Sequence, residues 1–334
     1  MLGKLKAAVQ LTRPAQWFKS LYLIIGAAPA MFLTPLSIVD IPLLIFASVI
    51  NLIMMQGVIY TINDITDLES DRKHPTKSKR PLAAGKISVK AASMLAFAFL
   101  IGALYIGFIL HPLIAVVDIL LLANALAYNI KPLRLKDKKY IDIASAASNF
   151  PLRVLVGWLA FEPYNAARLS LNINIASTEI VSNGIQSLFF ASSPQIIDLS
   201  IKFSTITLSA ISIMLMTFFI AVFMLALKRS SEKNMNLDPK SRRAILDSYS
   251  KRELSVIARL AAVLALISFI MLALSIKPIL LLSLPFAVYG MLKYYKMALQ
   301  TSNAAEPETV FRKHRNLIAL FVVFLLFAGL LLLI

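Results

Sequence analysis

Long runs of apolar residues fill most of the chain, and short stretches of polar and basic residues separate them. A helix that crosses a bilayer needs about 20 predominantly apolar residues. Windows of this kind occur near residues 17–35, 41–62, 89–110, 113–130, 140–161, 204–227, 256–276, 278–297 and 316–334. The pattern therefore predicts an all-α, polytopic membrane protein with nine transmembrane helices, in which residues 1–334 form a single domain.

The composition supports a lipid environment and narrows the chemistry. Of the 334 residues, 59% are hydrophobic and 15% are charged, whereas soluble domains carry about 25% charged residues. Cysteine is absent, which excludes disulfides and cysteine nucleophiles. The three histidines, His74, His111 and His314, are too scattered along the sequence to indicate a zinc site.

The basic residues predict the orientation of the helices in the membrane. With the N-terminus in the cytoplasm, 29 of the 34 Lys and Arg residues lie on the cytoplasmic side, and only Arg168, Lys202 and Lys277 lie outside. This asymmetry is typical of the positive-inside rule. We therefore predict a multi-pass protein of the cell membrane with a cytoplasmic N-terminus and an extracytoplasmic C-terminus. The long outer segment, residues 162–203, is interpreted as an extracytoplasmic insertion.

The same distribution explains the net charge of +17. A strongly basic chain is compatible with nucleic-acid binding, but here the positive charge lies mainly in the loops of one face. Such loops orient the protein and attract the anionic headgroups of membrane lipids. Membrane lipids are thus expected partners, and nucleic acid is not.

An acidic segment follows directly on the second predicted span. Asn63, Asp67 and Asp71 are four residues apart, and Asp64 stands three residues before Asp67. Residues at these spacings share one face of a helix, so their oxygens are expected to form one stripe. Crowded carboxylates are unfavourable unless a cation neutralises them, and Mg²⁺ often binds one or two carboxylates together with phosphate oxygens. We interpret these four residues as a Mg²⁺-dependent catalytic centre rather than as a solvated helix end.

The segment after these acids, residues 72–81, is densely basic. Carboxylates that hold a metal ion, beside Lys and Arg side chains that hold phosphate, form a set suited to a diphosphate group. Further residues are expected on the same cytoplasmic face, although the topology does not show whether they converge. The candidates for substrate binding at this face are Arg13, Lys19, Arg72, Lys77, Arg80, Tyr128, Lys131, Lys228, Arg229 and Glu232.

Arg153 is a further candidate because it lies inside the fifth predicted span. A charge at the centre of a membrane helix costs at least about 2.5–3.5 kcal/mol on insertion scales, so it usually faces the interior of the bundle. Two interpretations stay open for Arg153. It binds an anionic part of a substrate, or it forms a structural ion pair, for example with Asp118 in the fourth span.

The acidic segment contains the complete pattern Asn-Asp-x-x-Asp-x-x-x-Asp, and residues 80–87 read Arg-Pro-Leu-Ala-Ala-Gly-Lys-Ile. Both features resemble the UbiA superfamily of intramembrane transferases, and the similarity extends over most of the chain. Within it, residues 13–19, 150–157 and 228–250 resemble the decaprenyl-phosphate phosphoribosyltransferase-like members. A second Asp-x-x-x-Asp motif, typical of true prenyltransferases, is not evident between the sixth and seventh spans. Near the last span, His314 occupies a place where the relatives tend to carry Asp.

The resemblance implies a UbiA-like bundle of nine helices with a central cavity open to the cytoplasmic side. It also implies that Asp64, Asp67 and Asp71 hold Mg²⁺, which binds the diphosphate leaving group of a donor. The implied partners are this diphosphate-bearing donor and a lipid-linked substrate, which is a polyprenyl phosphate or a polyprenyl diphosphate.

Two reactions remain open, and the missing second motif favours the first. In the first, 5-phosphoribose passes from phosphoribosyl diphosphate to a polyprenyl phosphate, and Arg153, Lys228 and Arg229 are candidates for the additional phosphate of that donor. In the second, a polyprenyl group passes from its diphosphate to an aromatic or hydroxyl acceptor. A membrane transporter is a third hypothesis, but transporters usually place ionisable residues near the bilayer midplane. Here the acids cluster at a helix end.

Overall fold

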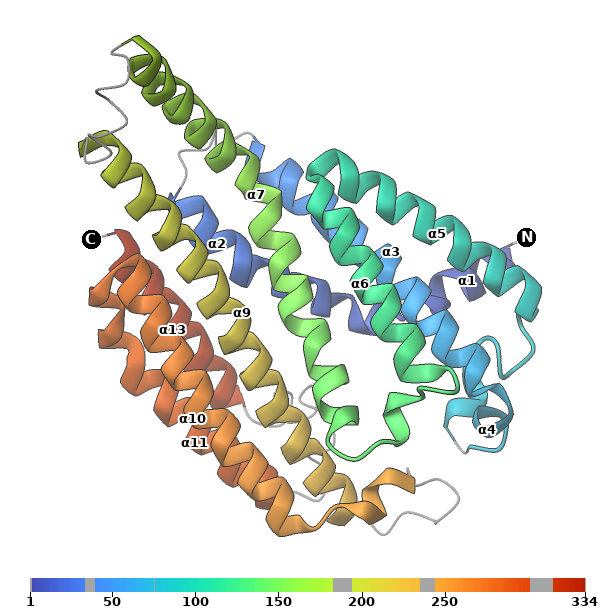
Figure 1. Cartoon of the computed structure of the whole chain (residues 1–334). Coiled ribbons are helices and arrows are strands. Elements are labelled where there is room, and N and C mark those ends of the chain that lie inside the picture. Colours follow the sequence, from blue (N-terminus) through green and yellow to red (C-terminus); the bar gives the residue numbers. More distant parts are fainter. Residues whose placement is uncertain are drawn as a thin grey trace.

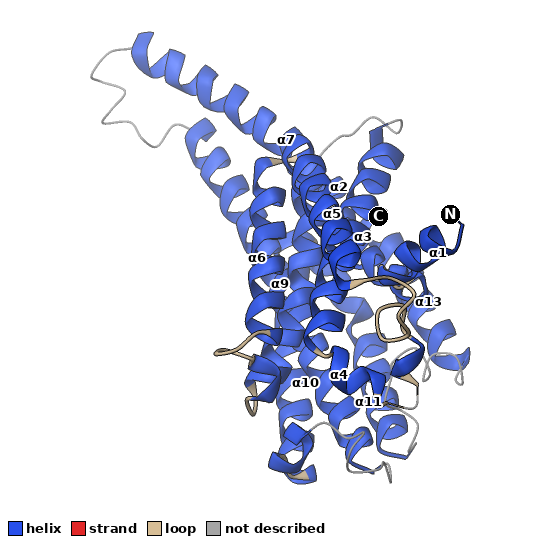
Figure 2. Ribbon diagram, turned by 90° about the vertical axis from the view of Figure 1, so that its right-hand side faces the viewer, coloured by secondary structure: helices blue, strands red, loops and turns tan. Residues whose placement is uncertain are grey.

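The computed structural model of the chain describes the backbone of residues 2–33, 40–74, 76–182, 194–234, 244–300 and 315–333. Every regular element in these ranges is a helix (Figures 1 and 2), which confirms the predicted all-α class. Within these ranges, seven segments are long and apolar enough to cross a membrane. They lie in α3 (Asp40–Thr66), α5 (Val89–Leu110), α6 (Pro112–Asn129), α7 (Ile141–Ser182), α9 (Pro194–Asn234), α10 (Lys251–Ile276) and the consecutive η5 (Pro278–Ser283) and α11 (Leu284–Gln300).

The first and ninth predicted spans are helical in the described residues but are not among these seven segments. The first window divides into a 3₁₀ helix, η1 (Pro14–Tyr22), and an α-helix, α2 (Leu23–Leu33). The 11 residues of α2 cover about 16 Å, roughly half of the hydrocarbon core. The ninth window contains α13 (Arg315–Leu333), whose apolar part is Ala319–Leu332. The predicted number of nine spans is therefore not confirmed.

The segment predicted as an outer insertion, residues 162–203, is largely a continuation of two helices. α7 contains 42 residues and α9 contains 41, so each is about 60 Å long, twice the thickness of a hydrocarbon core. Their green and olive ends project together beyond the other helices, at the end of the molecule opposite α4 (Figure 1). Residues 183–193, between them, lie outside the described residues.

Glycines allow a close contact between α2 and α7. α2 packs along α7, and a Cβ atom on Gly157 would overlap the backbone carbonyl of Leu23. A Cβ atom on Gly26 would likewise overlap the carbonyl of Val154. Small residues permit such close approach of helices in membranes, where van der Waals packing drives association. The contact fixes the part of α7 that carries Arg153.

Several short elements gather at one end of the bundle, which we call the motif end (Figures 1 and 2). It contains the end of α3, the end of α9 and the start of α10. The short elements are α4 (Leu68–Arg72), η2 (Lys77–Lys79), η3 (Leu135–Asp137) and η4 (Ala244–Ser248). Consecutive helices alternate in direction, so the connections α3–α5, α6–α7 and α9–α10 meet on the same side, as the sequence predicts.

Asp118 links three helices inside the bundle. Its side chain and that of Asn51 are fully buried. The Asn51 amide donates 2.8 Å hydrogen bonds to Asp118 Oδ2 and to the carbonyl of Ala103, which connects α3, α6 and α5. A Cβ atom on Gly107 would come 2.8 Å from the same Oδ2 atom. This geometry agrees with a structural role for Asp118.

Replacing Asn51 by leucine is expected to lower the free energy of unfolding by about 1–3 kcal/mol, because Asp118 loses its buried hydrogen-bond donor. Thermal unfolding of detergent-solubilised protein, followed by circular dichroism, measures the effect. The double variant Asn51→Leu/Asp118→Leu is the control. It should recover part of the loss, since replacing both polar partners leaves no unpaired group. Equal stability of wild type and Asn51→Leu would contradict the role of this contact.

Candidate active site

The helix is interrupted in the middle of the acidic segment. α3 ends at Thr66 and α4 begins at Leu68, while Asp67 between them has φ −104° and ψ 10°. Hydrogen bonds still run from Asp67 N to Asn63 O (3.0 Å) and from Asp71 N to Asp67 O (2.8 Å). The predicted single stripe is thus not formed by all the acids. Instead, the acidic side chains face two different sets of basic partners.

Asp64 and Asp71 share one guanidinium. Arg80 Nη1 lies 3.1 Å from Asp64 Oδ1 and 2.6 Å from Asp71 Oδ2. The two carboxylates are only 3% and 2% exposed, so leaving them without a counter-charge would be costly. Arg13 Nη2 adds a second contact to Asp64 Oδ1 at 2.5 Å, and Lys77 Nζ lies 3.9 Å from Asp71 Oδ1. Three predicted substrate-binding residues therefore converge on two predicted metal ligands.

Asp67 pairs with the connection between α6 and α7. Lys136 Nζ lies 2.6 Å from Asp67 Oδ1, and Arg134 Nη2 lies 3.8 Å from the same oxygen. Lys136 also donates to Asn129 Oδ1 at 3.2 Å. Lys136 and Arg134 were not among the predicted site residues, because from the sequence alone the basic residues of this loop indicated only the orientation of the helices.

The N-terminal segment reaches the site through an unusual backbone conformation. Arg13 has φ 51°, in the left-handed region that side chains other than glycine rarely adopt. Its guanidinium stacks 4.0 Å from the ring centroid of Tyr60 on α3. The Tyr60 hydroxyl donates to Gln16 Oε1, which also accepts from Lys19 Nζ at 3.2 Å. Lys19 therefore lies beside Arg13 through Gln16 and Tyr60.

Arg153 lies inside α7 and is 8% exposed. The phenolic groups with which it interacts electrostatically are those of Tyr60 and Tyr22. Because Tyr60 also contacts Arg13, Arg153 belongs to the same side of the bundle interior as the acidic segment. In the described part of the chain, Arg153 forms no ion pair, and the hypothesis that it pairs with Asp118 is wrong. The partner of Asp118 is Asn51.

The residues predicted near the end of α9 form a separate ion-pair group. Arg229 is 2% exposed, and its guanidinium bonds Asp142 Oδ2 at 3.1 Å and Glu232 Oε2 at 3.2 Å. Lys228 Nζ lies 4.0 Å from Glu232 Oε1, and Tyr128 interacts electrostatically with Arg229. Two carboxylates thus match the charge of Arg229, which suits an anchor between helices better than direct phosphate binding.

The remaining predicted residues lie at the margin of the site. Arg72 and Lys131 are exposed, and neither forms an ion pair with the motif acids among the described residues. Asn63 is half-buried, and its carbonyl accepts from the Thr66 hydroxyl at 3.0 Å. His314 lies outside the described residues.

The donor set is suited to Mg²⁺. Oxygens of Asp64 and Asp71 already converge on one cationic nitrogen, so a divalent cation could take the position of Arg80 Nη1. In the described residues, no three acidic or histidine side chains are close enough to bind a metal ion together. That is compatible with Mg²⁺, which is usually held by one or two carboxylates and by phosphate oxygens of the substrate.

Several known proteins are similar to this chain in sequence. The model of the UbiA prenyltransferase family matches residues 23–317. A decaprenyl-phosphate phosphoribosyltransferase from Mycolicibacterium smegmatis is 32% identical over 46% of this chain and 47% of its own length. The Mycobacterium tuberculosis protein of that name is 29% identical over 46% of this chain and 50% of its own length. The chain thus matches about half the length of these relatives.

A solved structure shows the same fold. The UbiA homolog from Archaeoglobus fulgidus, bound to GPP and Mg²⁺, aligns with 98% of this chain and 100% of its own with a TM-score of 0.59 and 17% sequence identity.

The contact of Arg80 with both Asp64 and Asp71 predicts that this residue contributes to stability. Arg80→Met should lower the free energy of unfolding by about 3 kcal/mol at neutral pH, because two buried carboxylates lose a counter-charge. Millimolar Mg²⁺ should restore most of the loss if the same carboxylates bind the metal ion. Thermal unfolding with and without Mg²⁺ measures both effects. The exposed Arg72→Met, in the same basic segment, is the control, and an Arg80→Met variant that is insensitive to Mg²⁺ would count against the metal site.

Proposed function

Because this chain belongs to the UbiA prenyltransferase family, we propose that it is a Mg²⁺-dependent membrane transferase that displaces diphosphate. Its proposed donor is phosphoribosyl diphosphate, and its proposed acceptor is a polyprenyl phosphate, to which it transfers 5-phosphoribose. The observation that carries the proposal is the pair of buried carboxylates, Asp64 and Asp71, that share one cation. The names of the relatives support the choice of substrates.

The basic residues supply the positive charge that a diphosphate leaving group requires. Arg13, Lys77 and Arg80 lie within 4 Å of the motif carboxylates, and Lys136 lies equally close to Asp67. When bound, Mg²⁺ would neutralise part of the diphosphate charge. The basic side chains then bind the remaining phosphate oxygens and stabilise the charge that develops as the leaving group departs.

The proposed reaction exchanges one bond at the anomeric carbon of ribose. The bond from this carbon to the diphosphate oxygen breaks, and the diphosphate leaves with the electron pair. An oxygen of the polyprenyl phosphate forms the new bond to the same carbon. Arg153 is our preferred residue for the 5-phosphate of the donor, because it is a buried cation beside Tyr60 and Tyr22. Lys228 and Arg229 are less suited, since Glu232 contacts both.

Prenyl transfer is the alternative. The structural neighbour from Archaeoglobus fulgidus is bound to GPP and Mg²⁺, and a site for a prenyl diphosphate needs the same carboxylates and cations. In that reaction the allylic carbon of a polyprenyl diphosphate loses diphosphate and bonds to an aromatic or hydroxyl acceptor. Prenyl transfer requires no buried cation for an additional phosphate. The presence of Arg153 therefore favours phosphoribosyl transfer.

The proposed topology follows from the positive-inside rule. Nine spans, counting the first and ninth windows, put the N-terminus in the cytoplasm and the C-terminus outside. The motif end and a central cavity then open to the cytoplasmic side, where a soluble donor enters, while the lipid-linked substrate reaches the cavity from the membrane. Residues 1–334 form one transferase domain, and residues 162–203 form its extracytoplasmic insertion.

The substrates can be tested with purified protein and Mg²⁺. We expect phosphoribosyl diphosphate and polyprenyl phosphate to give a lipid-linked phosphoribose, detected by thin-layer chromatography of a radiolabelled donor. Removal of Mg²⁺ with EDTA should abolish the product. If the protein instead turns over only a polyprenyl diphosphate, the phosphoribosyl proposal is wrong.

The acidic segment can be tested by one isosteric change. Asp67→Asn should reduce turnover by about two orders of magnitude or more, because removing a charge that acts in the transition state lowers kcat directly. Its thermal midpoint should stay close to that of the wild type. Glu69→Gln is a matched control, since Glu69 is an exposed carboxylate of the same acidic segment. Unchanged turnover in Asp67→Asn would remove this residue from the mechanism.

A further inference from the structure

The connection between α6 and α7, residues 130–140, is called the site loop. Two of its residues, Lys136 and Tyr140, contact other parts of the bundle. Lys136, in its middle, contacts Asp67, and Tyr140, at its end, contacts α10 and the segment before it. Tyr140 has φ 67°, a backbone conformation that costs energy for a bulky residue and persists only where surrounding contacts enforce it.

The first of these contacts is a buried relay of hydrogen bonds. The backbone N–H of Tyr140 donates to the hydroxyl of Tyr249 at 2.5 Å, and that hydroxyl donates to Asp142 Oδ1 at 2.5 Å. The other carboxylate oxygen of Asp142 accepts from Arg229 Nε at 3.1 Å. Asp142 is fully buried, Tyr249 is 1% exposed and Arg229 is 2% exposed. The end of the site loop is thereby attached to α9.

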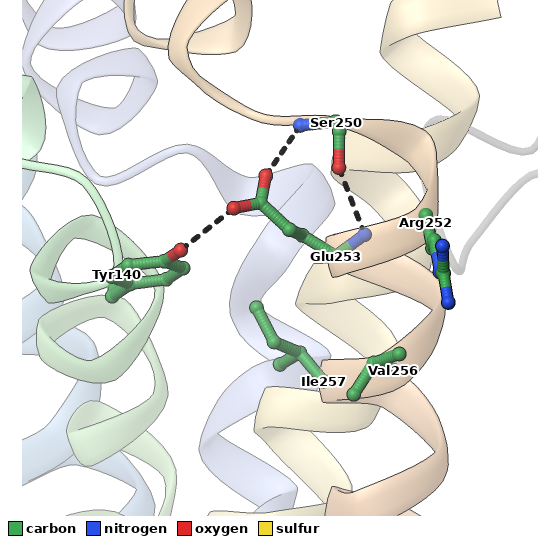
Figure 3. Close-up of a pocket in the computed structure, with 6 residues that line it drawn as sticks. All are labelled: Tyr140, Ser250, Arg252, Glu253, Val256 and Ile257. Carbon is green, nitrogen blue, oxygen red and sulfur yellow. Dashed lines mark hydrogen bonds between the residues drawn. The ribbon is translucent and has the colours of Figure 1, made fainter.

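The second contact lies on the surface. Glu253 accepts from the Tyr140 hydroxyl and from Lys139 Nζ, both at 2.9 Å, and the hydrogen bond with Glu253 raises the pKa of the Lys139 ammonium. Glu253 also belongs to a capping box with Ser250 at the start of α10, which holds its carboxylate in place. Figure 3 shows Glu253 between Ser250 and Tyr140. A surface hollow of about 300 Å³ adjoins these contacts and is lined by Tyr140, Ser250, Arg252, Glu253, Val256 and Ile257.

Tyr249 is suited to the central place in the relay. Burial raises the pKa of its phenol, so the hydroxyl keeps its proton at physiological pH and can donate to Asp142. Its ring packs edge-to-face on the ring of Tyr140, with the centroids 5.7 Å apart. Lys233 Nζ donates to the backbone carbonyl of Tyr249 and to that of Leu246. The residue is therefore fixed from α9 as well.

Only three residues separate Tyr140 from Lys136, and local hydrogen bonds stiffen them. Lys138 N donates to Leu135 O at 3.1 Å, and Asp142 N donates to Lys138 O at 3.0 Å. Arg134 Nε also bonds Asp137 Oδ2 at 2.6 Å. A displacement of Tyr140 is thus transmitted to Lys136 rather than absorbed by a flexible segment.

We propose that Asp142 and Tyr249 are positioning residues that latch the site loop and thereby place Lys136 and Arg134 against Asp67 for binding of the donor diphosphate. Neither residue touches the reacting atoms. The latch connects the α9–α10 side of the bundle with the acidic segment of α3. Its effect on donor binding rests on the proposed function, whereas its effect on the loop does not.

The decisive variant is Tyr249→Phe, which keeps the ring and removes only the hydroxyl. The control is Tyr289→Phe, because Tyr289 is an exposed tyrosine on α11. The chain contains no cysteine, so spin labels can be placed at Lys73→Cys and Lys138→Cys without background. Both lysines are exposed at the motif end. Pulsed EPR between the two labels reports the position of the site loop relative to α4.

We expect a narrow distance distribution in the wild-type background and with Tyr289→Phe, and a shifted or broadened one with Tyr249→Phe. In the transferase assay, Tyr249→Phe should raise KM for the diphosphate donor about tenfold and change kcat less than about twofold, because positioning of ground-state contacts is lost. Asp142→Asn, which weakens the same relay without removing side-chain volume, should shift both measurements in the same direction.

The possible outcomes separate the latch from general stability and from the proposed reaction. An unchanged distance distribution in both relay variants overturns the latch, even if the thermal midpoint falls. A changed distribution with an unchanged KM overturns its role in donor binding. If no donor is turned over by the wild type, the proposed function fails, while the EPR measurement still decides whether the latch exists.

Discussion

Two carboxylates buried at the motif end, those of Asp64 and Asp71, determine much of the surrounding structure, because buried negative charge must be matched by positive charge. Removing an ion from water costs several kcal/mol even after relaxation. Arg80 compensates both carboxylates from the loop after α4, and Arg13 adds a contact from the N-terminal segment. Segments far apart in the sequence are therefore drawn to one place by one electrostatic requirement.

The same requirement for charge balance explains how the site could exchange protein ion pairs for Mg²⁺ and a diphosphate. In the structure, Arg80 Nη1 stands between two carboxylates at the position suited to a divalent cation. Under the proposed function, Asp64 and Asp71 would hold Mg²⁺, and Arg80 would then face the diphosphate of the donor instead of a carboxylate. Arg13, Lys77 and Lys136 lie close enough to follow the same exchange. The cations that balance the acids in this structure would then bind the donor.

Buried polar groups elsewhere in the bundle have other kinds of partner, and one close helix contact involves no polar group. Asp118 is paired with an amide rather than with a cation, and α2 approaches α7 through Gly26 and Gly157. Arg153 differs from both, since it is a buried cation without an ion pair in the described residues. Arg229 is equally buried but is matched by Asp142 and Glu232. This contrast underlies the proposal that Arg153 binds the donor, whereas Arg229 belongs to the relay that holds the site loop.

The sequence by itself determined the helical class, the seven helices long and apolar enough to cross a membrane, and the acidic segment with its basic neighbours, because apolar run length and local spacing are properties of short stretches of chain. It could not determine that α7 and α9 continue into residues 162–203. The spans were predicted from apolar runs, and a helix made of polar residues gives no such run. Only the tertiary structure decided that Asp67 turns toward Lys136, that Asp118 pairs with Asn51, and that Asp142 and Tyr249 attach the site loop to α9. These contacts join residues 67 or more positions apart, and their formation depends on how the helices pack, which local spacing does not encode.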